Sequence, residues 1–289
     1  MILNITDMNM FKPFCCLYFL FFITNISYSQ LNDGTIVPDT FIKEIIKNIP
    51  EESTMDSDLS SVNLSVKLSI SVHAVRNNLG NMDIKKSDLS PVLLIVNNYF
   101  NKIGIQFSID TFDIVDDYNY SSITKNNNTK ELLVKHSEQN RINLYIVDSI
   151  NMGKALCTGY SYFPINQDTN YIFINKKYLT GNNLTMMLGH FFGLLSTHER
   201  RGGIEYVNEK NCRISGDFIC DTYADPDLKN AVDNNCNYNG SSMDPNGEYY
   251  IPSVANIMSD SPDHCKCIIT PLQYRRMLYY YKKYRQYLM

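Results

Sequence analysis

The chain has 289 residues, of which 44% are hydrophobic and 19% are charged, and its formal net charge is −4. This composition is typical of a globular protein, and the length suits one domain with a short leader. Basic residues occur as pairs such as Lys85–Lys86 and Lys176–Lys177, and do not form a stripe. The sequence therefore lacks the electrostatic pattern of a nucleic-acid-binding protein.

The N-terminus has the features of an export signal. Lys12 precedes an apolar run from Phe14 to Ile23, and the small residues Ser27 and Ser29 mark a cleavage site. The run is too short to span a bilayer, and no later segment has the pattern of a transmembrane helix. We therefore expect residues 1–29 to be a signal peptide and the protein to be secreted or displayed at the cell surface.

Export affects the expected state of the cysteines. Signal cleavage removes Cys15 and Cys16, and the remaining six should be oxidised outside the cytosol, in up to three disulfides of undetermined pairing. Zinc ligation by Cys265 and Cys267 is less favoured, because their spacing is one residue short of the usual structural-zinc pair. The disulfide candidates are Cys157, Cys212, Cys220, Cys236, Cys265 and Cys267.

A change of pattern marks the start of the folded domain. Residues 30–61 are polar and acidic, with only a short apolar patch from Phe41 to Ile46, which predicts a linker or prosegment. From Val62 to Val72, apolar residues alternate with mostly small or polar ones, which predicts a strand with one buried face. The domain is therefore predicted to span residues 62–289.

Helices and strands are then mixed along the chain, which predicts an α+β fold. A helix from Val92 to Ile103 follows Pro91 and ends at Gly104. A second helix is predicted from Leu184 to Leu195, and a long irregular stretch follows it. Alternating residues predict strands at Ile105–Ile109, Ile142–Ile146, Tyr160–Phe163 and Tyr171–Ile174.

The last predicted helix has a well-marked beginning. Thr270 is a favoured N-cap residue, and Pro271 suits the first helical position because that residue needs no backbone donor. The helix runs through Tyr274, Met277 and Tyr281, an aromatic face that favours packing over ligand binding.

The second predicted helix carries a partial metal-binding motif. Metzincin zinc proteases use H-E-x-x-H-x-x-G-x-x-H, in which two histidines lie on one helical face and the glycine turns the chain so that a third reaches the metal. The sequence MMLGHFFGLLS aligns with this motif at His190 and Gly193. The alignment places Met186 and Ser196 at the other two ligand positions and Met187 at the glutamate.

Landmarks around this helix occur in the order found in one protease family. They are the strands Ile142–Val147 and Gly159–Pro164, then GDFICDT at Gly216–Thr222, NIMS at Asn256–Ser259, Cys265, and TPLQYRRM at Thr270–Met277. Over roughly residues 62–288 the chain resembles the pappalysin-like zinc metalloproteases, which are metzincins. The resemblance implies a mixed sheet, an active-site helix, Met258 in the Met-turn beneath the metal, a C-terminal helix, and a disulfide between Cys236 and Cys265.

Departures from the family motif predict that catalysis is lost. Catalytic zinc needs three protein ligands, and His190 is the one family ligand that survives. Met187 has no ionisable group and cannot accept a proton from water. Asp260 stands where the resemblance implies an oxyanion-stabilising tyrosine, and its carboxylate would repel developing negative charge. We therefore expect no catalytic residues and no zinc cofactor.

Three functional hypotheses remain. The leading one is an exported pseudoprotease that binds a peptide or protein, because strand pairing along Tyr160–Phe163 needs no metal. The alternative is an active metalloendopeptidase with an unorthodox site, in which His198, Glu199 or His264 joins His190. The third is a protein retained for its fold alone.

Two other metal hypotheses concern neighbouring residues. Met186 and His190 could hold Cu(I), although methionines that fill the vacated space are the simpler interpretation. Calcium binding is implied by some relatives in the resemblance, although aspartates beside glycine and proline also form turns. The candidates for calcium are Asp217, Asp221, Asp225 and Asp227.

Overall fold

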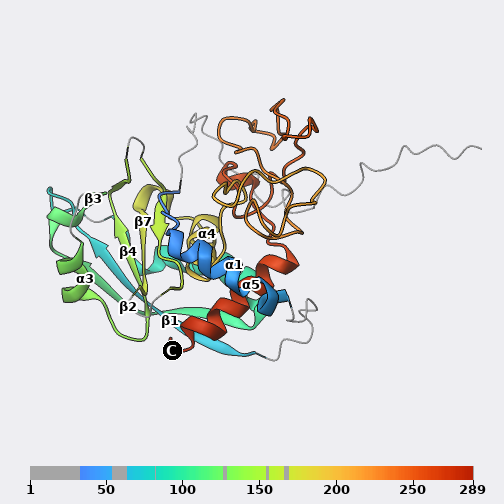
Figure 1. The fold of residues 1–289 in the computed structure, drawn as a ribbon. Helices are drawn as coiled ribbons and strands as arrows, with labels where there is room; N and C mark the ends of the chain where they lie inside the picture. Colours follow the sequence, from blue (N-terminus) through green and yellow to red (C-terminus); the bar gives the residue numbers. More distant parts are fainter. Residues whose placement is uncertain are drawn as a thin grey trace, which may run out of the picture.

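The computed structural model describes residues 33–53, 64–81, 83–125, 129–153, 156–165 and 169–288. The predicted signal peptide and parts of the predicted linker lie outside these ranges. The principal elements (Figure 1) are α1 Asp39–Ser53, β1 Val66–Val75, α2 Leu89–Phe100, β2 Ile105–Val115, β3 Ser122–Thr124, α3 Lys130–His136, β4 Ile142–Val147, β5 Ser149–Asn151, β6 Gly159–Ser161, β7 Tyr171–Asn175, α4 Gly181–Phe191 and α5 Pro271–Tyr280.

A five-stranded sheet in the order β2-β1-β4-β7-β6 forms the centre of the domain. The first four strands run parallel, and β6 pairs antiparallel with β7 at one edge. Strand β4 is buried at every position, as expected for a central parallel strand with both faces covered. Strands β3 and β5 form a separate parallel pair. The predicted α+β class is confirmed, and the sheet is mostly parallel.

Two hydrophobic clusters lie on the two faces of the sheet. Helices α2 and α4 pack together over one face, where Val96 and Leu188 meet the alternate residues Leu68, Ile70 and Val72 of β1. The other face is covered by residues of α3, β3 and β5. Alternation along β1 therefore sends its apolar side chains toward α4, the helix that carries the partial metal motif.

Local sequence signals place the ends of the helices. Thr270 accepts a hydrogen bond from the Gln273 backbone, and the Gln273 side chain accepts one from the Thr270 backbone, which completes a capping box at α5. Gly104 has φ +70° and ends the short turn after α2, and Gly193 has φ +94° just beyond α4. The predicted starts and stops of these helices agree with the structure to within a few residues.

Helix α1 lies within the segment that the sequence predicts to be a linker or prosegment. Phe41 and Ile45 of α1 are fully buried, and the Phe41 ring stacks on Phe163 with 4.5 Å between centroids. The helix lies beside α5 in Figure 1 and contacts it. The apolar patch in the sequence is too short to predict this helix. Most helical stability in proteins comes from tertiary packing, which the sequence pattern does not show.

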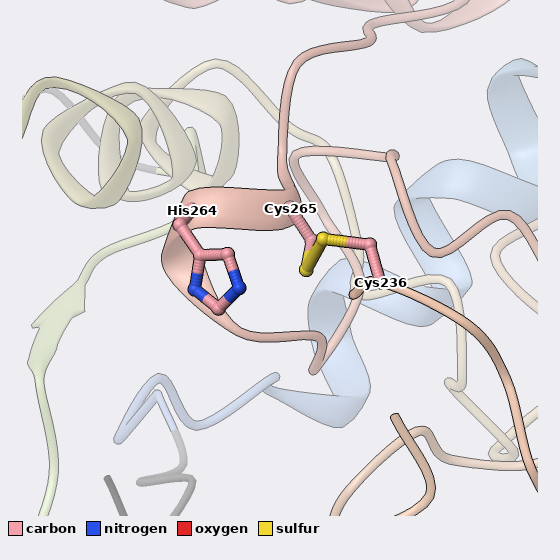
Figure 2. Close-up of side chains that lie close together, drawn as sticks. All are labelled: Cys236, His264 and Cys265. Atoms are coloured by element: carbon pink, nitrogen blue, oxygen red, sulfur yellow. A yellow bond between two sulfur atoms is a disulfide. The ribbon is translucent and has the colours of Figure 1, made fainter. Parts of the chain in front are cut away.

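The segment between α4 and α5 contains little regular structure and is crosslinked by two disulfides. Cys212 bonds to Cys220, and Cys236 bonds to Cys265, the pairing that the family resemblance implies. Figure 2 shows the second bond beside His264. Cys157 and Cys267 take part in neither bond.

Candidate functional site

Helix α4 presents the predicted motif residues to the interior. Met187 is fully buried, while Met186 and His190 are 4% and 1% exposed. Thr180 caps the helix by accepting a hydrogen bond from the Asn183 backbone. The helix therefore places one imidazole and two thioethers in a closed, mostly apolar environment.

The His190 ring contacts an acceptor through each nitrogen. Its Nδ1 lies 2.7 Å from the Leu194 carbonyl oxygen, and its Nε2 lies 3.1 Å from Oδ2 of Asp33. A carbonyl and a carboxylate can both be satisfied only when both ring nitrogens carry protons. The arrangement favours a charged imidazolium paired with a carboxylate.

Asp33 takes up contacts that a metal ion would otherwise make. Its Oδ2 lies 3.1 Å from His190 Nε2 and accepts a 3.4 Å hydrogen bond from Ser196 Oγ, so it contacts two of the three ligand positions. Burial acts to raise the pKa of Asp33. The charge and hydrogen bond of His190, with hydrogen bonds from Thr35, outweigh burial and hold the pKa of Asp33 well below its ordinary range.

Met186, at the remaining ligand position, contacts another buried charge. Lys266 Nζ lies 3.3 Å from the sulfur of Met186. Burial lowers the pKa of Lys266, while the carboxylates of Asp260 and Asp263 act in the opposite direction. A carboxylate and an ammonium group thus contact the three ligand positions, and this donor set does not fit zinc.

The residues of the alternative metal site do not gather around His190. Glu199 accepts hydrogen bonds from the backbones of Arg200 and Arg201, and His264 Nε2 lies 3.3 Å from the Asn234 carbonyl. Two groups of three potential ligands occur in the described part of the chain, Cys236–His264–Cys265 and His198–Asp227–Asp260. Neither includes His190, and the first contains two sulfurs bonded to each other (Figure 2).

Met258 lies beneath α4. The backbone of Gly189 leaves space for the Met258 sulfur, which would be 2.7 Å from a Cβ added at that glycine. The Met258 carbonyl accepts a hydrogen bond from the Thr197 backbone at 3.1 Å. These contacts tie the loop around Met258 to the end of the motif.

The four aspartates predicted to bind calcium take part in local hydrogen bonds. Asp221 accepts hydrogen bonds from Thr270 Oγ1 and from the Leu272 backbone at the start of α5. Asp225 accepts them from Thr197 Oγ1 and the Asp227 backbone. These three aspartates and Asp217 do not form a shared ligand group among the described residues.

A buried carboxylate pair lies elsewhere in the same region. Glu205 and Asp217 are 4% and 0% exposed. Both oxygens of Glu205 and Oδ2 of Asp217 lack a hydrogen-bond partner within the described ranges. Burial and the neighbouring Asp217 raise the pKa of Glu205 to about 9, and burial raises that of Asp217 to about 7 despite Arg276. Oxygen ligands of this kind suit calcium.

Comparison with known proteins finds a metalloprotease relative and a solved structure of the same fold. An extracellular metalloprotease of Colletotrichum graminicola is 28% identical over 266 residues, which cover 84% of this chain and 86% of that protein. A mutant of Tannerella forsythia promirolysin shares the fold with a TM-score of 0.53 at 16% identity, over 86% of this chain and 90% of that one. The chain is therefore similar in sequence to an extracellular metalloprotease and shares the fold of promirolysin.

Two other comparisons accompany this result. Mature mirolysin from Tannerella forsythia, solved with a cleaved peptide, gives a TM-score of 0.46 at 17% identity, over 74% of this chain and 90% of that one. No family model matches the sequence. Within the described ranges, every helix is too short or too polar to span a bilayer.

Replacement of Asp33 by Asn should destabilise the fold. The change removes a buried charge that faces His190, and breaking such a pair costs about 3 kcal/mol. Urea unfolding at pH 7 should show this loss, whereas Asp39→Asn, whose side chain is 90% exposed, should have little effect. Because the pKa of Asp33 is depressed, the difference should shrink as the pH falls below about 4. Equal stabilities at pH 7 would contradict the pairing.

Replacement of Glu205 by Gln should stabilise the metal-free protein at alkaline pH. Because the pKa of Glu205 is raised in the folded protein, folding favours its protonated form. Its contribution to the free energy of unfolding therefore declines as the pH rises from about 4.5 toward 9. In a chelator, Glu205→Gln should therefore melt higher than the wild type at pH 8 and approach it at pH 5.

At pH 8, calcium should raise the melting temperature of the wild type above that of Glu205→Gln. The ion favours the ionised carboxylate, which Gln cannot provide. The exposed replacement Glu248→Gln serves as the control. A wild-type melting temperature that calcium does not change would argue against a calcium site at Glu205 and Asp217.

Proposed function

We propose that this pappalysin-like protein is an exported, non-catalytic family member that binds an extended peptide along strand β6. The contact between Asp33 and His190 carries the proposal, because the carboxylate occupies the imidazole nitrogen that a catalytic metal would need. The extracellular relative supports export.

The side chains around His190 argue against hydrolysis. Met187 lies at the position of the general base and has no group that can accept a proton from water. Met186 is in contact with the Lys266 ammonium, whose charge opposes the approach of a metal cation. We assign Met258 to the Met-turn. In this proposal its side chain packs beneath α4 and does not lie below a bound metal.

The cleft already holds an extended backbone. The Gly34 amide donates a 2.7 Å hydrogen bond to the Gly159 carbonyl, and Ser161 donates its amide to Thr35 Oγ1 at 3.2 Å. Strand β6 is at the edge of the sheet, so its outer side can pair with another strand. Residues 33–35 thus provide a model, within the same chain, for peptide binding by strand addition.

A pocket beside this pairing offers room for side chains. It has a volume of about 310 Å³ and adjoins β6. Its size is at the lower end of the range for ligand pockets, and its aromatic walls favour an apolar or aromatic side chain. The lining includes Ile36, Pro38, Ile123, Tyr160, Tyr162 and Phe163.

The predicted prosegment acquires a role in this proposal. Residues 33–35 cover β6, and α1 anchors them through the buried side chains of Phe41 and Ile45. A peptide partner must displace residues 33–35 from β6, while α1 can remain packed. Residues 30–61 would then act as an internal competitor for the cleft.

Restoration of the motif tests the non-catalytic assignment. In the variant Met186→His, Met187→Glu and Ser196→His, three polar groups enter a buried site, so the metal-free melting temperature should fall and zinc should recover it. The wild type should contain no zinc that depends on His190 and should not cleave casein. Chelator-sensitive cleavage by the wild type that disappears in His190→Ala would overturn the proposal.

Opening of the cleft tests the peptide-binding assignment. In Gly34→Val, the new side chain would clash with Cys157 Cβ, 3.0 Å from an added Cβ, and with the Gly159 carbonyl at 3.1 Å. This clash should free β6 for a labelled peptide that copies residues 33–38. Fluorescence anisotropy should show binding at least ~10-fold tighter than to the wild type, because the internal competitor lowers the apparent affinity.

The exposed replacement Thr40→Val provides the control for this measurement and should bind the labelled peptide as weakly as the wild type. If folded Gly34→Val protein also binds no better than the wild type, strand addition at β6 is not the function of the cleft.

A further inference from the structure

A second cluster of potential metal ligands lies away from His190. His198, Asp227 and Asp260 each offer one ligand atom, and these atoms lie within 4.8 Å of one another. His198 follows α4, Asp227 belongs to the irregular segment, and Asp260 follows Met258. Three segments distant in the sequence thus converge on one imidazole and two carboxylates.

His198 and Asp260 are too far apart for a hydrogen bond. His198 Nε2 and Asp260 Oδ2 are 3.7 Å apart, beyond the usual limit of hydrogen-bond distances. In a tetrahedral site with metal–ligand bonds of about 2.1 Å, neighbouring ligand atoms are separated by about 3.4 Å. The pair is therefore close to the separation that a shared metal ion would impose.

The His198 ring lacks hydrogen bonds that would explain its position. Nδ1 is buried and has no partner in the part of the chain that the structure describes, and Nε2 lies 3.7 Å from the Asp260 carboxylate, too far for a hydrogen bond. A buried polar group without a partner loses the interactions it had with water. Coordination through Nε2, the nitrogen on the Asp260 side, would give the ring a bonded partner.

The charges near His198 favour a cation. Asp260, Asp225, Asp227 and Asp33 all act on its ring, and together they raise the pKa of His198 although burial acts to lower it. Lys266 acts on Asp260 with the opposite charge, and the Arg200 guanidinium donates a hydrogen bond to the carbonyl of Pro226, the residue before Asp227. Asp33 is already paired with His190, and Asp225 accepts hydrogen bonds from Thr197 and Asp227. Asp227 and Asp260 supply the two negative charges that would balance a dication, and Asp227 Oδ1 also accepts a 3.0 Å hydrogen bond from the Lys229 backbone.

We propose that His198, Asp227 and Asp260 bind a divalent transition-metal ion of the zinc type, with water completing the coordination. One imidazole nitrogen and two carboxylate oxygens form a ligand set that zinc accepts. The site is distinct from the contact between Asp33 and His190 and does not depend on the proposed function. It would connect the loop after α4 to the irregular segment and to the loop that follows Met258.

Titration of the full-length protein with Zn²⁺ in a calorimeter tests the site. The wild type should bind one equivalent, and Asp227→Asn should weaken binding at least ~10-fold, since loss of even an outer-shell partner costs that much. Asp227 is exposed, so this change should leave the fold intact. His198→Ala should abolish binding if the variant folds.

Two matched variants separate this proposal from the proposed function. Asp263→Asn removes an exposed carboxylate that also acts on Lys266 but lies outside the cluster, and it should retain zinc binding. His190→Ala should retain it too. The proposed site would be overturned if the wild type bound no zinc, or if the wild type and Asp227→Asn bound zinc with equal affinity. Zinc binding that is lost in His190→Ala and retained in Asp227→Asn would overturn both proposals.

Discussion

The pairing of Asp33 with His190 is the interaction on which the rest of the cleft depends. It joins residues 157 positions apart in the sequence and places a carboxylate against two former ligand positions. A buried charge pair is a weak source of net stability, but removal of one partner is costly. The pair therefore constrains the segment before α1 and the helix α4 to one another, so that the cleft and its covering strand form a single packed unit.

The residues around His190 combine polarisable side chains with opposite charges. Met186 and Met187 fill space with polarisable, adaptable side chains, and Lys266 introduces a positive charge near the place of the lost cation. Asp33 supplies a negative charge beside the surviving imidazole. The helix α4 region thus keeps opposite charges close together by means of its own side chains.

Local signals in the sequence were sufficient to predict the sheet and most helices. The alternation in β1, the left-handed glycines Gly104 and Gly193, and the capping box at Thr270 each depend on neighbouring residues. Family resemblance also supplied the bond between Cys236 and Cys265.

Local sequence signals could not predict the contacts that define the site. Asp33, Lys266 and Glu205 look like surface charges in the sequence, and their burial results from tertiary packing between distant segments. Helix α1 was missed for the same reason, because its stability comes from α5 and Phe163 more than from its own pattern.

The disulfide between Cys236 and Cys265 gives the cleft a dependence on cellular compartment. Cys265 directly precedes Lys266, so the crosslink fixes the backbone from which the ammonium group reaches Met186. In a reducing environment that anchor would be absent, and the buried lysine would be free to return to solvent. Formation of this disulfide would then do more than strengthen the fold, because it would set the electrostatic character of the cleft in an oxidising compartment.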